Sequence, residues 1–244
     1  LLVSDTGSRV LRLNSFTYVD PANLTSVDPD FGQRGTRVTL RGQGLRSGGK
    51  RVARVSIGGA DASEIVQESD TEVIIVAGRR LAGSGLDVVA YSDSGATAGL
   101  TGAFEYLDEG NITAVEPSSG QVGTYVSVTG QRLLGGGTQI VSASLADVAA
   151  TVGFFNDTLV VLRAQSGTVG TGHVVLRADT GAVVTAENGW QYLQAGSISS
   201  VVPSSGQHNT LVTIAGTSLL GAGTDAKYVT LGGISASLVS WNDT

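Results

Sequence analysis

One short pattern occurs three times along this chain, and this repeat limits the folds that the sequence can adopt. Residues 23–29 (Asn-Leu-Thr-Ser-Val-Asp-Pro) align with residues 111–117 and 197–203, at spacings of 88 and 86 residues. In each copy a Gly stands three residues after the Pro, an alternating segment follows, and another Gly ends that segment. These shared positions are Gly32, Gly120 and Gly206, then residues 38–40, 126–128 and 212–214, then Gly42, Gly130 and Gly216. Self-similarity at a nearly constant spacing indicates an array of equivalent structural units.

Within each copy the local pattern is that of short β-strands. Apolar and polar residues alternate at residues 73–76, 86–91, 159–162 and 173–176. This period of two is typical of half-buried strands, and no segment keeps a helical period over about twelve residues. Asp93-Ser94-Gly95 and Asp179-Thr180-Gly181 predict tight hairpin turns. Short strands separated by frequent turn signals predict antiparallel β-sandwiches, and the 41% of hydrophobic residues can supply their cores.

The pattern shared by the copies resembles the IPT/TIG domain. It runs from Pro through Gly to Val-x-Val/Ile/Leu-x-Gly, and it closes on the motifs Phe104-Glu105-Tyr106 and Trp190-Gln191-Tyr192. The resemblance implies an all-β fold of tandem immunoglobulin-like antiparallel β-sandwiches in a linear array. It implies no single function, because such domains occur in plexins, transcription factors, bacterial adhesins and polysaccharide-active enzymes.

Two positions depart from the shared pattern. Gly35 and Gly123 correspond to Asn209 in the third copy, and the Gly-Gly pairs at 58–59 and 232–233 correspond to Ala146-Asp147 in the second. Asn and Asp tolerate turn conformations well, so the predicted fold is unchanged.

The copies divide the chain into four segments. Residues 23–110 and 111–196 are two complete repeats, and residues 197–244 are an incomplete one. Residues 1–22 resemble the C-terminal strands of a preceding or donated repeat, because Phe16-Thr17-Tyr18 lies 88 residues before Phe104-Glu105-Tyr106. In one interpretation, this segment completes the third repeat of another protomer and builds a filament head to tail by strand addition. In the other, the chain is part of a longer array. The second interpretation is favoured, because neither end contains a counterpart of residues 159–174.

Four Asn-x-Thr sequons are candidate N-glycosylation sites: Asn23, Asn111, Asn156 and Asn242. They form two equivalent pairs, one at the start of a repeat and one in a loop that follows a strand. Both positions are expected at the surface, as a glycan requires. The alternative is that a short motif arose by chance and was copied with the repeat. We expect glycans only if the source is a eukaryote, and they would then indicate a secreted glycoprotein.

The charge pattern argues against nucleic acid as a partner. The net charge is −6, whereas a protein that binds phosphates needs a cationic surface. The densest basic stretch runs from Arg46 to Arg54 and is expected to be a solvated loop. Since no run of 18 apolar residues exists, we expect no membrane insertion by this segment.

Metal, cofactor and catalytic motifs are not recognisable. His173 and His208 lie in different repeats and the chain has no Cys, so a zinc site is not expected. Calcium is weakly suggested by Asp28 and Asp30 and by Asp108 and Glu109. It is not expected, because the equivalent positions are not acidic in every repeat.

Motifs for covalent catalysis and phosphate binding are also not recognisable. Ser118-Ser119-Gly120 and Ser204-Ser205-Gly206 lack the nucleophile elbow of hydrolases. The runs at residues 83–85 and 135–137 lack the Lys-Ser/Thr of a phosphate loop and are interpreted as strand connectors. We therefore expect no cofactor and no enzymatic activity.

The aromatic residues of the closing motifs are expected in the core. They are Phe16 and Tyr18, Phe104 and Tyr106, and Trp190 and Tyr192. Phe154, Phe155 and Trp241 lie near loops and are the better candidates for exposed contacts.

We expect a structural segment of an extracellular rod, stalk or filament, which continues into a longer repeat chain or associates with itself. The alternative is a carbohydrate- or protein-binding region of a cell-surface adhesin or receptor. Strand exchange between identical copies would favour the first role. A large apolar groove or a row of exposed aromatic residues would favour the second.

Overall fold

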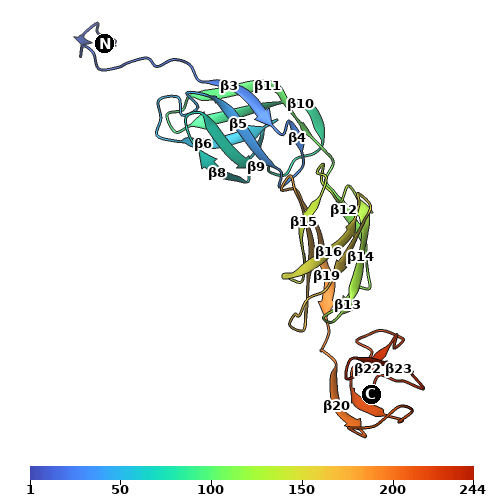
Figure 1. The fold of residues 1–244 in the computed structure, drawn as a ribbon. Coiled ribbons are helices and arrows are strands. Elements are labelled where there is room, and N and C mark those ends of the chain that lie inside the picture. Colours follow the sequence, from blue (N-terminus) through green and yellow to red (C-terminus); the bar gives the residue numbers. More distant parts are fainter. The chain divides into compact units, whose positions relative to one another are not determined.

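The computed structural model describes residues 1–244 and consists of β-strands and loops, with no helix (Figure 1). The all-β, antiparallel fold class predicted from the alternation is therefore confirmed. Contacts divide the chain into two compact units. The first comprises Leu1–Phe31 and Arg37–Tyr106, and the second comprises Gly32–Thr36 and Leu107–Thr244.

The first complete repeat contains two sheets. One sheet has the order β3 (Asn23–Asp28), β5 (Arg37–Gln43), β9 (Glu72–Val76) and β8 (Glu64–Glu68). The other has the order β4 (Phe31–Gly32), β11 (Thr97–Tyr106), β10 (Gly83–Ser92), β6 (Val52–Ile57) and β7 (Ala60–Asp61). The hydrogen bonds lie in the plane of each sheet, so one face of each sheet can pack against the other sheet. This is the arrangement of a β-sandwich.

The alternating pattern of the sequence decides which side chains enter this sandwich. On β5, Val38 and Leu40 are fully buried while Arg37 and Arg41 are exposed, because successive strand side chains point to opposite faces. The first core combines such positions from both sheets, including Ile57, Ile75, Val88 and Phe104.

The second repeat uses the same strands in a different arrangement. Its strands are β12 (Asn111–Glu116), β13 (Ser119–Gly120), β14 (Tyr125–Gln131), β15 (Ile140–Leu145), β16 (Val148–Phe155), β17 (Leu159–Arg163), β18 (Gly170–Ala178) and β19 (Val183–Tyr192). β16 pairs with β15 through Ala149 and Ala150 and then with β17 from Thr151 onward. The single strand β16 thus belongs to both sheets of the second repeat. In the first repeat two separate strands, β7 and β8, occupy the corresponding places.

The predicted hairpin turns are present. Asp93-Ser94-Gly95 connects β10 to β11, and Asp179-Thr180-Gly181 connects β18 to β19. Gly95 and Gly181 have φ angles of +89° and +88°, a region in which glycine carries no steric cost.

The glycine run at residues 83–85 is part of a strand, so its interpretation as a connector is wrong. β10 begins at Gly83, which pairs with Tyr106. Hydrogen bonding to β11 extends this strand through a glycine-rich stretch whose local pattern does not favour a strand. The run at residues 135–137 does lie in a loop, between β14 and β15.

The residues outside the two complete repeats form fewer paired strands. Residues 1–22 form only β1 (Leu2–Val3) and β2 (Arg9–Val10), so the strand expected around Phe16 is not formed. Strand propensity depends on a neighbouring strand and a core to pack against. Residues 197–244 contain two isolated pairs, β20 (Ser197–Val202) with β21 (Thr213–Thr217) and β22 (Val229–Leu231) with β23 (Ile234–Ala236). No helix is long and apolar enough to span a bilayer.

Candidate functional site

The four sequon asparagines are all exposed. Asn23 and Asn111 are the first residues of β3 and β12, where they pair with Gln43 and Gln131. The Thr hydroxyls of these two sequons donate hydrogen bonds across the sheet, Thr25 to the Arg41 carbonyl at 3.0 Å and Thr113 to the Thr129 carbonyl at 3.2 Å.

The sequon at Asn156 has a different local geometry. Asn156 lies in the turn between β16 and β17, and its Oδ1 accepts from the main-chain N–H groups of Thr158 and Leu159, both at 2.8 Å. The Thr158 hydroxyl is 3.0 Å from the same oxygen. This is an Asx turn, and it places the amide and the hydroxyl group of one sequon side by side. At Asn242, Oδ1 accepts from the N–H of Thr244 at 3.3 Å.

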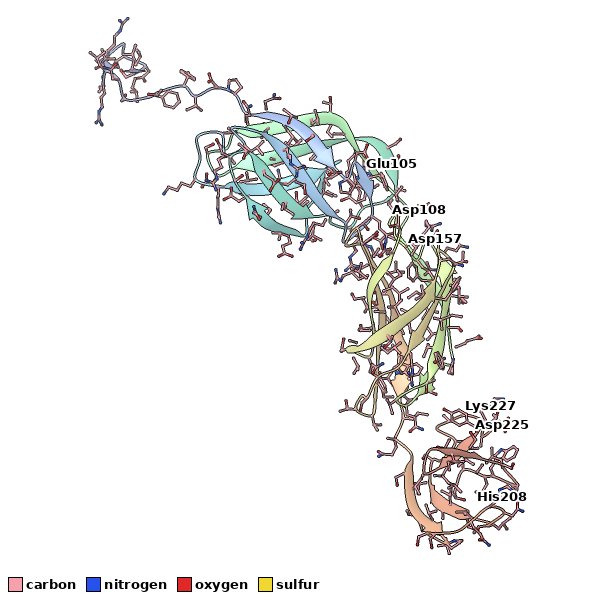
Figure 2. All side chains as sticks on the ribbon, in the orientation of Figure 1. Glu105, Asp108, Asp157, His208, Asp225 and Lys227 are labelled. Atoms are coloured by element: carbon pink, nitrogen blue, oxygen red, sulfur yellow. The ribbon has the colours of Figure 1, made fainter.

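A shallow surface pocket of about 260 Å³ lies in the first repeat, beside the ends of β4, β10 and β11. Its lining residues are Asp30, Phe31, Gly85, Gly102, Ala103, Phe104 and Glu105. The Phe31 side chain is 41% exposed, and the carboxylates of Asp30 and Glu105 stand on neighbouring segments. Figure 2 labels Glu105 near the end of β11. The Glu105 N–H donates to the Asp30 carbonyl at 2.8 Å, which holds the two segments together.

The residues that line this pocket differ in the second repeat. The second repeat has Ser118 and Ser119 at the positions of Asp30 and Phe31, and Gln191 at the position of Glu105. Thr171 and Asn188 stand where the first repeat has Gly85 and Gly102, so the second repeat lacks both the small residues and the carboxylates. An aromatic ring beside carboxylates can contact a sugar or a basic side chain.

Sequence reasoning did not find this pocket. From the sequence, Asp30 is expected only as half of a calcium pair with Asp28, and residues 83–85 are expected to be a connector. The available signal was the difference between the copies: Asp30 and Phe31 replace a Ser-Ser pair that the other two repeats share.

The residues considered for metal binding remain separate. His173 is exposed, and its Nδ1 accepts from the Asn188 N–H at 3.1 Å. His208 lies in the third repeat (Figure 2). No group of three or more His, Cys, Asp or Glu side chains comes together.

Two arginines of the basic stretch Arg46–Arg54 pair with acidic side chains, whereas Lys50 and Arg51 are exposed. Arg46 makes two parallel hydrogen bonds to the Glu68 carboxylate, both at 3.0 Å. Arg54 contacts Asp61 at 2.7 Å, and its guanidinium lies 3.7 Å from the centre of the Tyr91 ring. These partners raise the pKa of both arginines, chiefly through the side-chain hydrogen bonds to Glu68 and Asp61. The stretch therefore presents paired arginines as well as solvated residues.

The closing aromatic motifs of the two complete repeats are core residues. Phe104, Tyr106, Trp190 and Tyr192 are each no more than 2% exposed, and within each motif the two rings meet edge to face. Burial raises the pKa of the Tyr106 and Tyr192 hydroxyls. The expectation is wrong for Phe16 and Tyr18, which are 75% and 90% exposed. Their rings contact each other, but no second sheet covers them.

The three aromatic residues near loops differ in exposure. Phe154 is 58% and Trp241 49% exposed, as expected for contact candidates. Phe155, by contrast, packs against the second core.

Comparison with protein families finds the IPT/TIG domain in three copies, at residues 22–106, 111–192 and 197–244. None of the curated proteins compared with the chain matches it.

Similar solved structures include the full extracellular region of plexin A4, which is 19% identical and has a TM-score of 0.45. That match covers 88% of this chain and 19% of the plexin chain. Another is SGBP-B from a xyloglucan utilization locus of Bacteroides uniformis, 17% identical with a TM-score of 0.31, where the match covers 75% of this chain and 55% of that one. A third is gamma-CGTase from an alkalophilic Bacillus clarkii, 13% identical with a TM-score of 0.32, where the match covers 68% of this chain and 24% of that one. The chain therefore spans less than two thirds of each.

Proposed function

Because the chain belongs to the IPT/TIG domain family, we propose that it is a non-enzymatic structural segment of an extracellular rod, stalk or filament. One observation carries this proposal: the two complete repeats each bury a core of their own. The first core draws only on residues of the first repeat and the second only on residues of the second. Each unit therefore closes its own hydrophobic interior, and a chain of such units can be lengthened without building a larger core.

Electron microscopy of the native protein at neutral pH tests the structural role. We expect beaded rods or regular filaments in which the repeats are arranged in series. Compact monomers with no serial arrangement of repeats would contradict it and would favour the binding role described below.

Self-assembly is a more specific form of the same proposal. Residues 1–22 would pack as donated strands on the third repeat of the next copy. The support is that Phe16 and Tyr18 carry the closing motif but lie in solvent, whereas the third repeat has only two isolated strand pairs. An exposed apolar segment beside unpaired strand edges favours pairing with another chain.

Light scattering coupled to size exclusion tests the assembly. We expect a mass that increases with concentration, and we expect the double change Phe16→Ser and Tyr18→Ser to abolish the increase. The matched control is Phe154→Ser, which also removes an exposed aromatic side chain (58% exposed) but lies in the second repeat, outside both the donated segment and the third repeat. A constant monomer mass at every concentration would reject strand donation while leaving the serial rod intact.

A second candidate function is ligand binding by a cell-surface adhesin or receptor, favoured by the pocket beside Phe31. The pocket combines an exposed ring with Asp30 and Glu105, which the second repeat replaces with Ser118 and Gln191. Its ligand would be a carbohydrate that stacks on the ring, or a protein segment that presents a basic side chain.

Nuclear magnetic resonance titration tests this binding. We expect oligosaccharides or a basic peptide to shift the amide signals of Gly102 and Ala103, and we expect Phe31→Ala to remove the shift. Phe154→Ala, which removes an exposed ring outside the pocket, is the control. Saturating amounts of both ligand classes without any shift would exclude the pocket as a binding site.

A further inference from the structure

A Gly-Gln-x-x-Thr loop occurs in all three copies of the repeat and has the same conformation in each. Its glutamines are Gln33, Gln121 and Gln207, and its threonines are Thr36, Thr124 and Thr210. In each copy the Thr hydroxyl oxygen accepts from the Gln N–H, at 3.0, 3.2 and 2.9 Å. The Thr N–H in turn donates to the Gln carbonyl. The loop therefore holds the start of the glutamine side chain in a similar place each time.

Two of these side chains bind the linker that follows their own repeat. Gln33 Oε1 accepts from the main-chain N–H of Gly110 at 2.7 Å, and Gln121 Oε1 accepts from that of Gly196 at 2.6 Å. Gly110 and Gly196 are the residues directly before β12 and β20. Since an N–H can only donate, the oxygen of each carboxamide must face the linker. Both contacts lie within the second compact unit, to which the loop Gly32–Thr36 belongs.

A second glycine makes room for each glutamine. A Cβ at Gly135 would lie 2.6 Å from Ala182 Cβ and 2.7 Å from Gln33 Nε2, and a Cβ at Gly221 would collide with Gln121 Nε2. Both glycines occupy the loop that follows the second long strand of their repeat, and both have positive φ angles, +56° and +58°. A side chain at either glycine would therefore force the docked glutamine to move.

The first repeat shows that backbone conformation alone does not require these glycines. Ser47 occupies the position of Gly135 and Gly221 and has a similar φ of +48°. Ala22 occupies the position of Gly110 and Gly196. A glycine therefore stands at both positions in the two places where this chain contains the glutamine that docks there.

We propose that Gln33 and Gln121 are docking residues that hold the linkers. Each recognises two features of the following repeat: the N–H of the glycine directly before its first strand, and the glycine in the loop after its second long strand. The two linkers that carry this glycine pair are restrained by the contact.

Gln207 supplies the internal control. Its loop has the same conformation, but its side chain is exposed and makes no hydrogen bond. A change at this position removes a glutamine of the same kind without removing a docking contact.

Amide hydrogen exchange of the full chain, resolved by residue, tests the proposal. We expect Gln33→Met to raise the exchange rate of Gly110 about tenfold and Gln121→Met to raise that of Gly196 about tenfold, since each loses one hydrogen bond of ordinary strength. Each variant should leave the other linker unchanged, and Gln207→Met should leave both unchanged. Gln121→Glu keeps the acceptor oxygen and should preserve the slow exchange of Gly196.

Two results would overturn docking. One is an unchanged exchange rate at the linker glycine of both methionine variants. The other is an equal increase in the Gln207→Met protein. If Gln33→Met unfolds the chain, because Gln33 is only 1% exposed, the half-buried Gln121 decides the question through its methionine and glutamate variants.

Discussion

The carboxylate of Asp179 accepts hydrogen bonds from the main-chain N–H and the hydroxyl group of Thr138, at 3.1 and 2.7 Å. This pair ties the β18–β19 turn to the loop that precedes β15. Asp93 does the same in the first repeat, where it accepts from the N–H of Lys50 at 2.8 Å. An Asp at the hairpin turn is therefore a repeated connection between two loops of the sandwich.

These contacts predict a dependence of stability on pH. Hydrogen bonds favour the ionised form and lower the pKa of Asp179, chiefly through the Thr138 hydroxyl, and that of Asp93, chiefly through the Lys50 N–H. A lowered folded-state pKa contributes stability that is complete above the unfolded Asp value of about 3.9 and is lost as the pH falls through the folded value. We expect the urea midpoint to be lower at about pH 3 than at about pH 5, because the loss of stability begins below the unfolded value.

The variant Asp179→Asn should weaken this pH dependence, because an amide does not titrate. Asp147→Asn is the control, since Asp147 is exposed and makes no side-chain hydrogen bond. Urea unfolding of both proteins at the two pH values measures the effect. An unaltered dependence in the Asp179→Asn protein would show that this turn does not contribute.

The closing aromatic of the second repeat should carry a large share of its stability. Trp190 is fully buried and packs edge to face on Tyr192. We expect Trp190→Ala to reduce the free energy of unfolding by about 3–5 kcal/mol, because the core loses a large apolar side chain and gains a cavity. Phe154→Ala, at a position 58% exposed, should change it by less than about 0.5 kcal/mol. Calorimetry of both variants compares them, and similar losses would be inconsistent with the assigned core.

Gly42, near the end of β5, is required because the backbone of β3 approaches it closely. A Cβ at Gly42 would collide with the Asn23 carbonyl beside the irregular register between Leu24 and Ser26. We expect Gly42→Ala to destabilise the first repeat by about 1–3 kcal/mol.

Gly99→Ala is the matched control within the same repeat. Its Cβ would meet only ordinary contacts, the nearest 3.6 Å away, so the change should be close to neutral. Thermal melts of the two variants give the comparison. Equal melting temperatures would contradict the close approach at Gly42.

The sequons predict glycosylation when the chain is secreted from eukaryotic cells. All four asparagines are exposed, so each change to Gln at Asn23, Asn111, Asn156 or Asn242 should lower the apparent mass by one glycan. Thr158→Val should act like Asn156→Gln, whereas Thr158→Ser keeps the hydroxyl group and should keep the glycan. Mass spectrometry before and after glycosidase treatment is the measurement, and an unmodified secreted chain would refute the prediction.

Sequence patterns predicted the fold class of the two complete repeats well, because their signals are local. Alternation at Val38 and Leu40 already indicates one buried strand face, and Asp93-Ser94-Gly95 already indicates a hairpin. Local patterns could not predict that β16 pairs with both β15 and β17, because pairing partners depend on how the two sheets meet.

The sequence pattern could not predict the pocket for a related reason. Asp30 and Glu105 are 75 residues apart in the chain and become neighbours through the pairing of β4 with β11. The Gln33–Gly110 contact joins residues 77 positions apart. Neither relation follows from spacing along a single strand.

By itself, the sequence determined that this protein is a series of similar β-sandwiches, because strand periodicity, turn residues and repeat spacing are all encoded locally. The tertiary structure alone decided which copies of a shared motif are buried. Phe16 and Tyr18 repeat the motif of Phe104 and Tyr106, yet the first pair is exposed and the second is core. The physical reason is that burial needs an opposing sheet to exclude water from the rings, and only the complete repeats supply one.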